Sequence, residues 1–452
     1  MIKITVDNKT KLEGLPDKYQ DRIKAAMTLD NDKYYKLKNM NKNVYNVPKV
    51  FKYYKEKNDK LILPRGSRAR AIGFVEAAGF EYRLKDNTIK EEANFSGWEP
   101  IDLRDYQKPI VNEIDQEDYR EGIWELSTGS GKTVMALEMI RRKGLRTVIL
   151  VHNNRLLNQW KEEFEKFFDY TPGQINGEDK NIAKVTLCSF ATLRNREDLL
   201  DRLADRTGMV FVDEAHGVAA KTRAKVMSKL KPHYLYGLTG TAERTDSKEQ
   251  AIFFYLGEKI YEYDMHDIDP KVEVINSKIE LPDKKEYYEM VEAMVNHSNR
   301  NKLIAGTVIG NVLEGRTVLC LTKRIEHFEN IKEHIGDKEG FHYISGDSED
   351  REVLLEGMKK GVLDFNALFG TTKLLSTGVD IPSLDTLIIA CDLKSSVLMR
   401  QSVGRILRME EDKKRPKVID IADITRGSND VFKNQFYSRQ DVYKKKEWEI
   451  IN

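Results

Sequence analysis

The segment Trp124–Thr133 constrains the fold most, because an apolar run, a glycine-rich turn and the start of a helix follow one another without a gap. The apolar run predicts a buried strand, and Val134–Ile140 predicts a helix. Gly129 and Gly131 let the chain turn tightly and aim backbone N–H groups at an anion. Because the N-terminus of a helix carries a partial positive charge, this arrangement predicts a phosphate-binding loop. Leu126 departs from the full motif, which has a glycine there.

The loop also carries the side chains that a nucleotide and its metal ion require. We expect Lys132 to contact the β- and γ-phosphates and Thr133 to bind Mg²⁺. A glycine-rich turn with a chance lysine is the alternative, and the flanking strand and helix favour the phosphate loop. The predicted nucleotide contacts in the loop are Thr128, Gly129, Ser130, Gly131, Lys132 and Thr133.

A chain of 452 residues predicts about three domains of roughly 150 residues each. Hydrophobic residues make up 40% and charged residues 33%, which indicates a soluble protein with buried cores. No apolar run approaches the ~18 residues of a membrane span, and the N-terminus shows no secretory signal. Cys188, Cys320 and Cys391 lie in apolar stretches without CxxC spacing, so we expect core residues in a reducing, cytoplasmic compartment.

Positive charge is concentrated at the start of the chain. Residues 1–100 contain 21 Lys and Arg against 14 Asp and Glu, whereas the whole chain has a net charge of only +2. An ordinary solvated surface and a nucleic-acid footprint both explain this excess. Lysines also alternate with aromatic residues in 33–38 and 51–55, a composition that suits base stacking or a helix with a buried aromatic edge. We expect a flexible basic loop, with phosphate contacts from Arg65, Arg68 and Arg70.

Strand and helix patterns alternate from about residue 101 to 426, which predicts an α/β fold of two parallel-sheet lobes after a small α+β region. Proline and carboxylates interrupt the pattern at 267–270, and a final helix is expected to pack on the second lobe. The predicted domains are 1–98, 99–270, 271–426 and 427–452. The predicted strands lie at 61–64, 148–151, 185–188, 209–212, 234–238, 317–321, 367–369 and 386–390.

Two carboxylates, Asp213 and Glu214, follow an apolar strand of the first lobe. Ligands of parallel sheets bind at the carboxyl ends of the strands, so this pair is expected beside the phosphate loop. Asp213 is suited to hold Mg²⁺, and Glu214 to orient and deprotonate the attacking water. His216 is either a core histidine or a residue that couples hydrolysis to nucleic-acid movement.

Seven segments follow one another in an order that resembles the superfamily 2 helicases over residues 101–426. The resemblance implies two RecA-like lobes that close on ATP and Mg²⁺. In the first lobe it implies adenine contacts from Arg104 and Gln107, nucleic-acid contacts from Asn153, Arg155, Ser189 and Thr192, and coupling by His216, Thr239 and Thr241. In the second lobe it implies nucleic-acid contacts from Thr322, Lys323, Arg324, Thr371 and Thr372, and ribose contacts from Gly378 and Asp380.

The segment Gln401–Arg408 supplies the most discriminating residues of this resemblance. Arg405 and Arg408 are three residues apart, so we expect them on one face of a helix. A permanently charged guanidinium can stabilise charge on the γ-phosphate during hydrolysis, and Gln401 belongs to the same catalytic segment. Provided from the second lobe, these arginines would make hydrolysis depend on closure.

Within the superfamily, the Asp-Glu-Ala-His segment at 213–216 and the basic N-terminal region resemble a DNA-directed branch. That branch includes the UvsW-like branch-migration helicases and the XPB and type III restriction motors. The expected function is a monomeric ATP-dependent helicase or translocase that remodels branched DNA. A duplex translocase that displaces proteins, an RNA helicase and a nucleotide-gated clamp remain as alternatives, and the RNA alternative depends on 2′-OH contacts that a sequence does not reveal.

Overall fold

The computed structural model describes residues 1–116, 118–127, 129–218, 221–240, 249–263, 269–281, 286–345, 348, 350–372, 381–394, 396–407, 413–424 and 430–451. The chain forms two compact units, Met1–Asp264 and Met265–Asn452. The boundary predicted at residue 98 lies inside the first unit. None of the described helices is long and apolar enough to cross a membrane.

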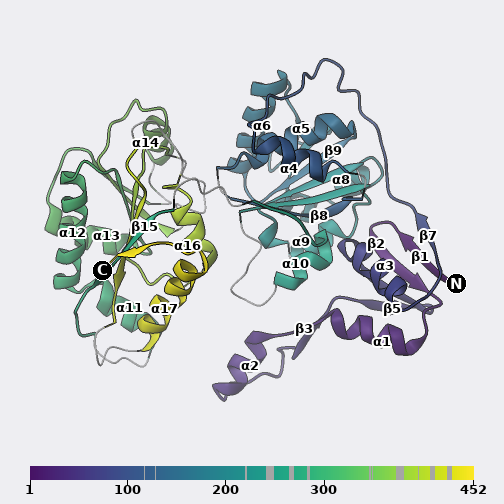
Figure 1. The fold of residues 1–452 in the computed structure, drawn as a ribbon, viewed down its shortest axis with the longest axis horizontal. Coiled ribbons are helices and arrows are strands. Elements are labelled where there is room, and N and C mark those ends of the chain that lie inside the picture. Colours follow the sequence, from purple (N-terminus) through teal and green to yellow (C-terminus); the bar gives the residue numbers. More distant parts are fainter. Residues whose placement is uncertain are drawn as a thin grey trace. The chain divides into compact units, whose positions relative to one another are not determined.

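The N-terminal region is an α+β layer around one small sheet, which Figure 1 draws in purple and dark blue. Its strand order is β5-β6-β2-β1-β7, with β1 parallel to β7 and the other pairs antiparallel. A ribbon of β3 and β4 carries α2, which has no buried residue, away from this sheet (Figure 1). The elements are β1 (Ile2–Val6), β2 (Lys9–Glu13), α1 (Asp17–Ala26), β3 (Thr28–Asp30), α2 (Asp32–Asn39), β4 (Val50–Lys52), β5 (Lys55–Lys57), β6 (Lys60–Pro64), η1 (Arg65–Ser67), α3 (Arg68–Ala77) and β7 (Tyr82–Asp86).

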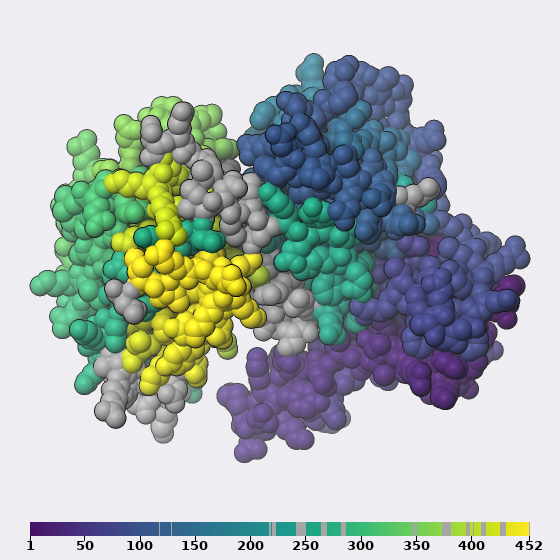
Figure 2. Space-filling view, viewed as in Figure 1, coloured from purple at the N-terminus to yellow at the C-terminus, as the bar shows by residue number. Residues whose placement is uncertain are grey.

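The N-terminal region packs directly on the first lobe, and the two are in contact in the space-filling view (Figure 2). Phe254 of the lobe is buried in the N-terminal core, and its carbonyl accepts a hydrogen bond of 3.2 Å from Ser67 Oγ. A Cβ on Gly66 would lie 2.3 Å from the backbone nitrogen of Gly257, so only glycine fits this approach. The segment between β7 and α4 connects the N-terminal region to the lobe. Its Trp98 lies against the lobe, where Lys184 Nζ is 4.8 Å from the centre of the indole ring.

The predicted flexible basic loop at 65–70 is wrong. Residues 65–67 form η1, and α3 begins at Arg68. Arg65 is 3% exposed, and its Nη1 donates a hydrogen bond of 2.9 Å to the buried carboxylate of Glu121. Arg68 Nε donates to the same carboxylate at 2.7 Å, and Arg70 pairs with Glu258 on the surface. These arginines therefore hold the N-terminal region on the lobe, with Arg65 Nη1 and Arg68 Nε both bonded to Glu121.

The first lobe contains a parallel sheet of order β10-β11-β9-β12-β13-β8-β14. Helices α4, α5 and α6 pack on one face and α7 to α10 on the other, which forms three layers. The predicted strands are confirmed, and their apolar residues are buried because helices cover both faces. The elements are α4 (Gln107–Ile114), β8 (Glu121–Leu126), α5 (Lys132–Lys143), β9 (Thr147–Val151), α6 (Asn154–Phe168), β10 (Gly173–Ile175), β11 (Val185–Ser189), α7 (Phe190–Asn195), α8 (Glu197–Ala204), β12 (Met209–Asp213), η2 (Ala215–Gly217), α9 (Lys221–Met227), β13 (Tyr234–Thr239), α10 (Glu249–Leu256) and β14 (Lys259–Tyr263).

The second unit repeats this architecture with a parallel sheet of order β17-β18-β16-β19-β20-β15-β21. Helices α12 and α13 pack on one face, and α14, α16 and α17 pack on the other. The predicted C-terminal helix is α17, whose Tyr443 is buried in the core. The elements are β15 (Lys271–Asn276), α11 (Tyr287–Val295), α12 (Ser298–Leu313), β16 (Val318–Thr322), α13 (Ile325–Ile335), β17 (Phe341–Ile344), α14 (Arg351–Lys359), β18 (Ala367–Thr371), β19 (Thr386–Ile389), α16 (Ser396–Val403), β20 (Lys417–Ala422), α17 (Asp430–Lys445) and β21 (Ile450–Ile451).

Candidate nucleotide-binding site

The glycine-rich loop joins the carboxyl end of β8 to the N-terminus of α5. Gly129 and Gly131 have φ values of 89° and 78°, in the left-handed region that favours glycine. Gly131 is the N-cap of α5, so the first N–H groups of that helix point out of the loop. Lys132 Nζ donates a hydrogen bond of 3.2 Å to the carbonyl of Leu126, which folds the lysine back over the loop.

The segment before α4 holds this loop in place. Gln107 is 4% exposed, and its Nε2 donates a hydrogen bond of 2.9 Å to the carbonyl of Ser130. The hydroxyl of Tyr106 donates to the same carbonyl at 3.2 Å, and the backbone N–H of Arg104 donates to Gln107 Oε1 at 3.0 Å. A Cβ on Gly131 would lie 2.3 Å from Gln107 Nε2. The amide of Gln107 therefore braces the phosphate loop, in addition to the adenine contact that we expected of it.

The acidic pair lies at the same sheet edge as the loop. Asp213 ends β12 and Thr239 ends β13, the strand between β12 and β8, so their carboxyl ends are adjacent. Burial raises the pKa of Asp213, and the Glu214 carboxylate raises it further. Burial opposes ionisation of Glu214 too, but the hydrogen bond from His216 and the charge of Lys132 lower its pKa. Lys132 therefore acts electrostatically on both carboxylates.

Two histidines surround Glu214. The backbone of this residue has φ 51° and ψ 55°, a left-handed conformation that is uncommon for residues other than glycine. His216 Nδ1 lies 3.1 Å from Glu214 Oε2, and His152 Nε2 lies 2.9 Å from the Glu214 carbonyl oxygen. Burial and the charge of Arg223 lower the pKa of His152 to about 4, so this ring is neutral near pH 7. His216 is thus in direct contact with the candidate water-orienting residue.

Trp160 is a site residue that the sequence did not reveal. This side chain of α6 is 1% exposed, and its Nε1 donates a hydrogen bond of 2.9 Å to Asp213 Oδ2. The other carboxylate oxygen, Oδ1, accepts a bond of 2.9 Å from the Glu214 N–H. The helical spacing of Leu157, Trp160 and Phe164 predicts a buried stripe, but no pattern marks one member of that stripe as a partner for a carboxylate.

The donor set at the sheet edge fits Mg²⁺. A carboxylate and a hydroxyl, from Asp213 and Thr133, are the oxygen ligands that this ion prefers. Each oxygen of Asp213 accepts one hydrogen bond and retains a lone pair for a cation. Within the described part of the chain, no group of three or more His, Cys, Asp or Glu is arranged to hold a metal ion by itself. Such sparse protein ligation is usual for Mg²⁺ that is also bound by phosphates.

The expected nucleic-acid contacts of the first lobe lie at helix N-termini near the same edge. Asn153 is the N-cap of α6, and its Oδ1 accepts a hydrogen bond of 2.9 Å from Leu156 N–H. Arg155 and Thr192 are half-buried in α6 and α7, whereas Ser189 is only 5% exposed. The first two turns of α6 therefore carry expected nucleic-acid contacts, and Trp160 of the same helix contacts Asp213.

In the second unit, two of the residues expected to contact nucleic acid have buried side chains. Thr322 is fully buried, and its Oγ1 donates a hydrogen bond of 3.2 Å to the Arg324 carbonyl. Thr371 is 5% exposed at the end of β18. Lys323 remains half exposed, although its Nζ lies 2.7 Å from Asp392. Arg324 and Thr372 are also partly exposed.

The expected helix through 401–408 is only partly correct. Helix α16 ends at Val403, where the Gly404 N–H donates a hydrogen bond of 2.8 Å to the Arg400 carbonyl. Arg405 therefore follows the helix in a turn. The helical face expected for Arg405 and Arg408 stays a prediction, because Arg408 is not among the described residues. Gln401 lies in α16, but its side chain is outside the description. Thr128, Thr241, Gly378, Asp380 and Arg408 lie outside the described residues.

Comparison with known proteins identifies two family models within the chain. A model described as "Type III restriction enzyme, res subunit" matches residues 100–244, and one described as "Helicase conserved C-terminal domain" matches residues 299–410. The first match contains the phosphate loop and the acidic pair. The second contains α16 and Arg405.

Curated relatives and solved structures extend the similarity over most of the chain. Putative helicase 161L of Invertebrate iridescent virus 6 is 29% identical over 86% of this chain and 91% of its own length. DNA 3'-5' translocase XPB2 of Sulfurisphaera tokodaii is 23% identical over 73% of this chain and 83% of its own. A fragment of a putative HsdR subunit of a type I restriction enzyme from Vibrio vulnificus YJ016 shares the fold. Its TM-score is 0.57 at 17% identity, with 83% of this chain and 85% of that chain covered.

Proposed function

Since this chain belongs to the superfamily 2 helicases, we propose that it uses ATP hydrolysis to move along DNA and to remodel branched DNA. Its tandem RecA-like lobes and helicase-type sequence make it an ATP-hydrolysing helicase. The proposal specifies DNA rather than RNA as the nucleic acid. It also specifies branched DNA rather than plain duplex.

The observation that carries the proposal is the arrangement of Lys132, Asp213 and Glu214 at one sheet edge. Burial raises the pKa of Asp213, and the charge of Lys132 opposes this rise and also lowers the pKa of Glu214, so all three groups lie within electrostatic reach of one another. An anion cradle beside two carboxylates is the arrangement that hydrolysis of a nucleoside triphosphate requires. A structural ion pair would not need the left-handed glycine loop at a helix N-terminus.

We assign the hydrolytic roles to residues of both units. Lys132 binds the β- and γ-phosphates, and Glu214 orients the attacking water and accepts its proton. Asp213 and Thr133 would hold Mg²⁺, which neutralises charge on the phosphates when it is bound. From the second unit, Arg405 and Arg408 stabilise charge on the γ-phosphate, with Gln401 beside them. His216, Thr239 and Thr241 couple the site to DNA.

For DNA, we propose contacts from partly exposed residues at the helix N-termini and sheet edges. These contacts come from Asn153, Arg155 and Thr192 in the first lobe and from Lys323, Arg324 and Thr372 in the second. Arg65 and Arg68 are not counted among these surface contacts, because both are ion-paired with Glu121. The excess charge of residues 1–100 supports attraction of a phosphate backbone. The preference for branched DNA rests on the sequence resemblance alone.

The experiment that tests the proposal is ATP hydrolysis by the full chain with single-stranded, duplex, forked and four-way DNA and the matching RNA. Forked or four-way DNA should stimulate turnover most, and Lys132→Ala should abolish it. Glu162→Gln, a change on the exposed surface of α6, is the matched control for Glu214→Gln. ATP hydrolysis that none of these nucleic acids stimulates would overturn the proposal. Greater stimulation by RNA would reverse the choice of substrate.

A duplex translocase that displaces proteins without separating strands is the second candidate, because no strand-separating element can be identified among the described residues. Strand displacement on forked DNA should be compared with triplex displacement on plain duplex. Triplex displacement without strand separation would favour this second candidate.

A further inference from the structure

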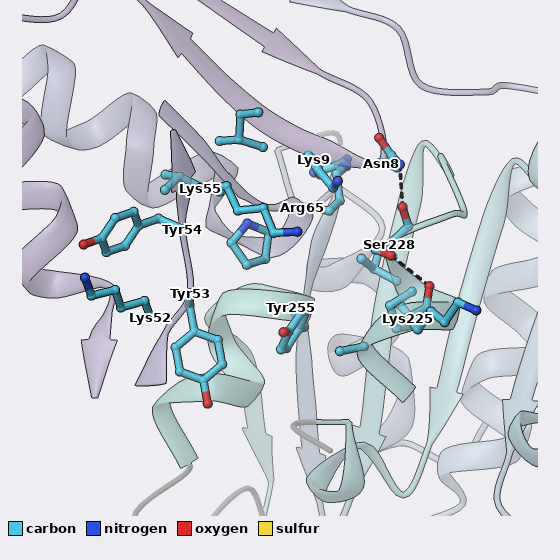
Figure 3. Close-up of a pocket in the computed structure, with 16 residues that line it drawn as sticks. Asn8, Lys9, Lys52, Tyr53, Tyr54, Lys55, Arg65, Lys225, Ser228 and Tyr255 are labelled. Carbon is cyan, nitrogen blue, oxygen red and sulfur yellow. Dashed lines mark hydrogen bonds between the residues drawn. The ribbon is translucent and has the colours of Figure 1, made fainter. Parts of the chain in front are cut away.

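A cavity of about 250 Å³ lies between the N-terminal region and the first lobe. Its lining comes from β2, from β4 to β6, from η1, from β13 and from helices α9 and α10. In Figure 3, Tyr53 and Tyr255 lie together on one side of it, and Lys9 and Arg65 lie together on another. This cavity is separate from the phosphate loop and the acidic pair, none of whose residues line it.

The cavity is strongly basic. Lys9, Lys52, Lys55 and Lys225 line it together with Arg65, and no carboxylate is among the described residues that line it. Within the described residues, none of these four lysines has an ion-pair partner, whereas many other lysines of the first unit do. Positive groups of one sign around a concave surface raise the local concentration of anions.

Arg65 distinguishes this cavity from a chance group of surface lysines. The residue is 3% exposed, and its Nη1 donates to Glu121 at 2.9 Å. Its Nε and Nη2 atoms have no hydrogen-bond acceptor among the residues that the structure describes. Glu121 is shared with Arg68, so two guanidinium groups face one carboxylate and a positive charge is left over. Buried donors of this kind are normally paired, so they indicate an anionic ligand.

The cavity also offers aromatic rings. Tyr53, Tyr54 and Tyr255 line it and are only partly buried. The rings of Tyr53 and Tyr255 are 6.1 Å apart and nearly perpendicular. Lys52 Nζ lies 5.9 Å from the ring centre of Tyr54, which places a cation beside an aromatic face. Aromatic faces next to cations are typical of sites that stack a base and bind its phosphate.

We infer that this cavity binds one unpaired nucleotide, with its phosphate toward the lysines and Arg65 and its base against the tyrosines. The volume limits the ligand, since pockets for drug-sized molecules usually measure about 300–1,000 Å³. A nucleotide within a DNA strand and a free nucleotide share this chemistry. The strand is the expected source, and that part rests on the proposed function. Unpaired nucleotides occur where branched DNA opens, so the site would hold such DNA against the first lobe.

The test uses the full chain and 2-aminopurine, a fluorescent base whose emission falls on stacking. The probes are a gapped duplex with 2-aminopurine at its one unpaired position, the same duplex fully paired, and free 2-aminopurine nucleotide. The gapped duplex should bind more tightly than the paired one and lose emission. The double variant Lys52→Ala, Lys225→Ala should bind it about tenfold more weakly, because two phosphate-neutralising charges are lost. Its salt dependence should also flatten by about 0.7 per lysine removed.

Lys57→Ala is the matched control, because Lys57 is exposed in β5 and does not line the cavity. Tyr54→Ala should abolish the emission change, whereas Tyr54→Phe should keep it because the ring remains. Binding of the double variant that equals binding of Lys57→Ala would overturn the inference. If free 2-aminopurine nucleotide binds as tightly as the gapped duplex, the site still takes a nucleotide, but a free one.

The failure of this inference can be told apart from failure of the proposed function. DNA-stimulated ATP hydrolysis by the unaltered protein tests the proposed function and does not depend on the cavity. If stimulation is present and the double variant resembles its control, only the cavity assignment is wrong. If DNA does not stimulate hydrolysis but the cavity still binds nucleotide, only the proposed function is wrong.

Discussion

Trp160 Nε1 donates a hydrogen bond of 2.9 Å to Asp213 Oδ2, so one indole links the core of α6 to the candidate metal ligand. The N-terminus of the same helix carries Asn153 and Arg155, which we propose as DNA contacts. A shift of α6 on DNA would therefore change the position of Trp160 relative to Asp213. We expect this bond to transmit DNA binding to the hydrolytic site.

Replacing Trp160 with phenylalanine should weaken ATP hydrolysis by removing the hydrogen bond to Asp213. Phenylalanine keeps an aromatic ring in the core, but Asp213 loses a donor that lowers its pKa. Hydrogen bonds to charged groups contribute about 1.5–3 kcal/mol, so we expect kcat for ATP hydrolysis to fall about tenfold with little change in KM. Because Asp213 must be ionised to bind a cation, the acid limb of the pH–rate profile should move to higher pH. Steady-state kinetics across pH checks both effects.

The control for this change is Trp124→Phe in β8. Trp124 is also fully buried in the sheet core, but its Nε1 has no hydrogen-bond partner among the described residues. That variant should lower stability without moving the acid limb. An unchanged pH profile for Trp160→Phe would show that the indole only fills space.

Glu121 should be critical for the attachment of the N-terminal region. Its side chain is 1% exposed and accepts hydrogen bonds from Arg65 and Arg68. Glu121→Gln leaves the buried guanidinium of Arg65 and the partly buried one of Arg68 without a carboxylate, which should cost about 3–5 kcal/mol. Glu258→Gln removes a similar pair with Arg70 on the surface, where the expected cost is about 0–1 kcal/mol. Urea unfolding of the two variants should show this difference, and equal midpoints would refute it.

Much of the fold could be predicted because both sheets are covered on two faces. Parallel strands buried in this way appear as short apolar runs, such as 148–151 and 367–369, and the structure places β9 and β18 there. The position of Asp213 beside the phosphate loop was also predictable, because the carboxyl ends of parallel strands share one edge. Local patterns were sufficient to predict a residue's position wherever that position depends only on the strand and on where the strand ends.

The remaining features depend on contacts between residues distant in sequence. Arg65 and Glu121 are 56 positions apart, and no pattern in 65–70 reveals that a buried carboxylate binds Arg65. Thr322 was expected to contact nucleic acid because of the family resemblance, but its side chain is fully buried and its hydroxyl donates to the Arg324 carbonyl. The helical repeat through 401–408 continues past Val403, yet Gly404 ends the helix. Tertiary packing overrides local propensity in each of these cases.

Arg405→Ala should reduce hydrolysis strongly while nucleotide binding persists. We propose that its guanidinium stabilises charge that develops on the γ-phosphate, so its removal should lower kcat by about 10³–10⁵-fold. Arg415→Ala, which removes an exposed arginine of the same unit, should leave kcat nearly unchanged. Single-turnover hydrolysis and equilibrium binding of a fluorescent ATP analogue distinguish the two steps. Loss of binding with unchanged single-turnover rates would contradict the assignment.

Acid should destabilise the first unit through His233. This residue is 2% exposed, and burial and the charge of Arg120 lower its pKa to about 3 from 6.5. Between these pKa values, His233 is protonated in the unfolded chain and neutral in the folded chain. The free energy of unfolding therefore falls as pH falls from about 6.5 toward 3. Between pH 7 and pH 5, the free energy of unfolding of His233→Gln should fall by about 1–2 kcal/mol less than that of the unaltered protein. Exposed His334 provides the control, because His334→Gln should retain the full acid sensitivity in urea unfolding at both pH values.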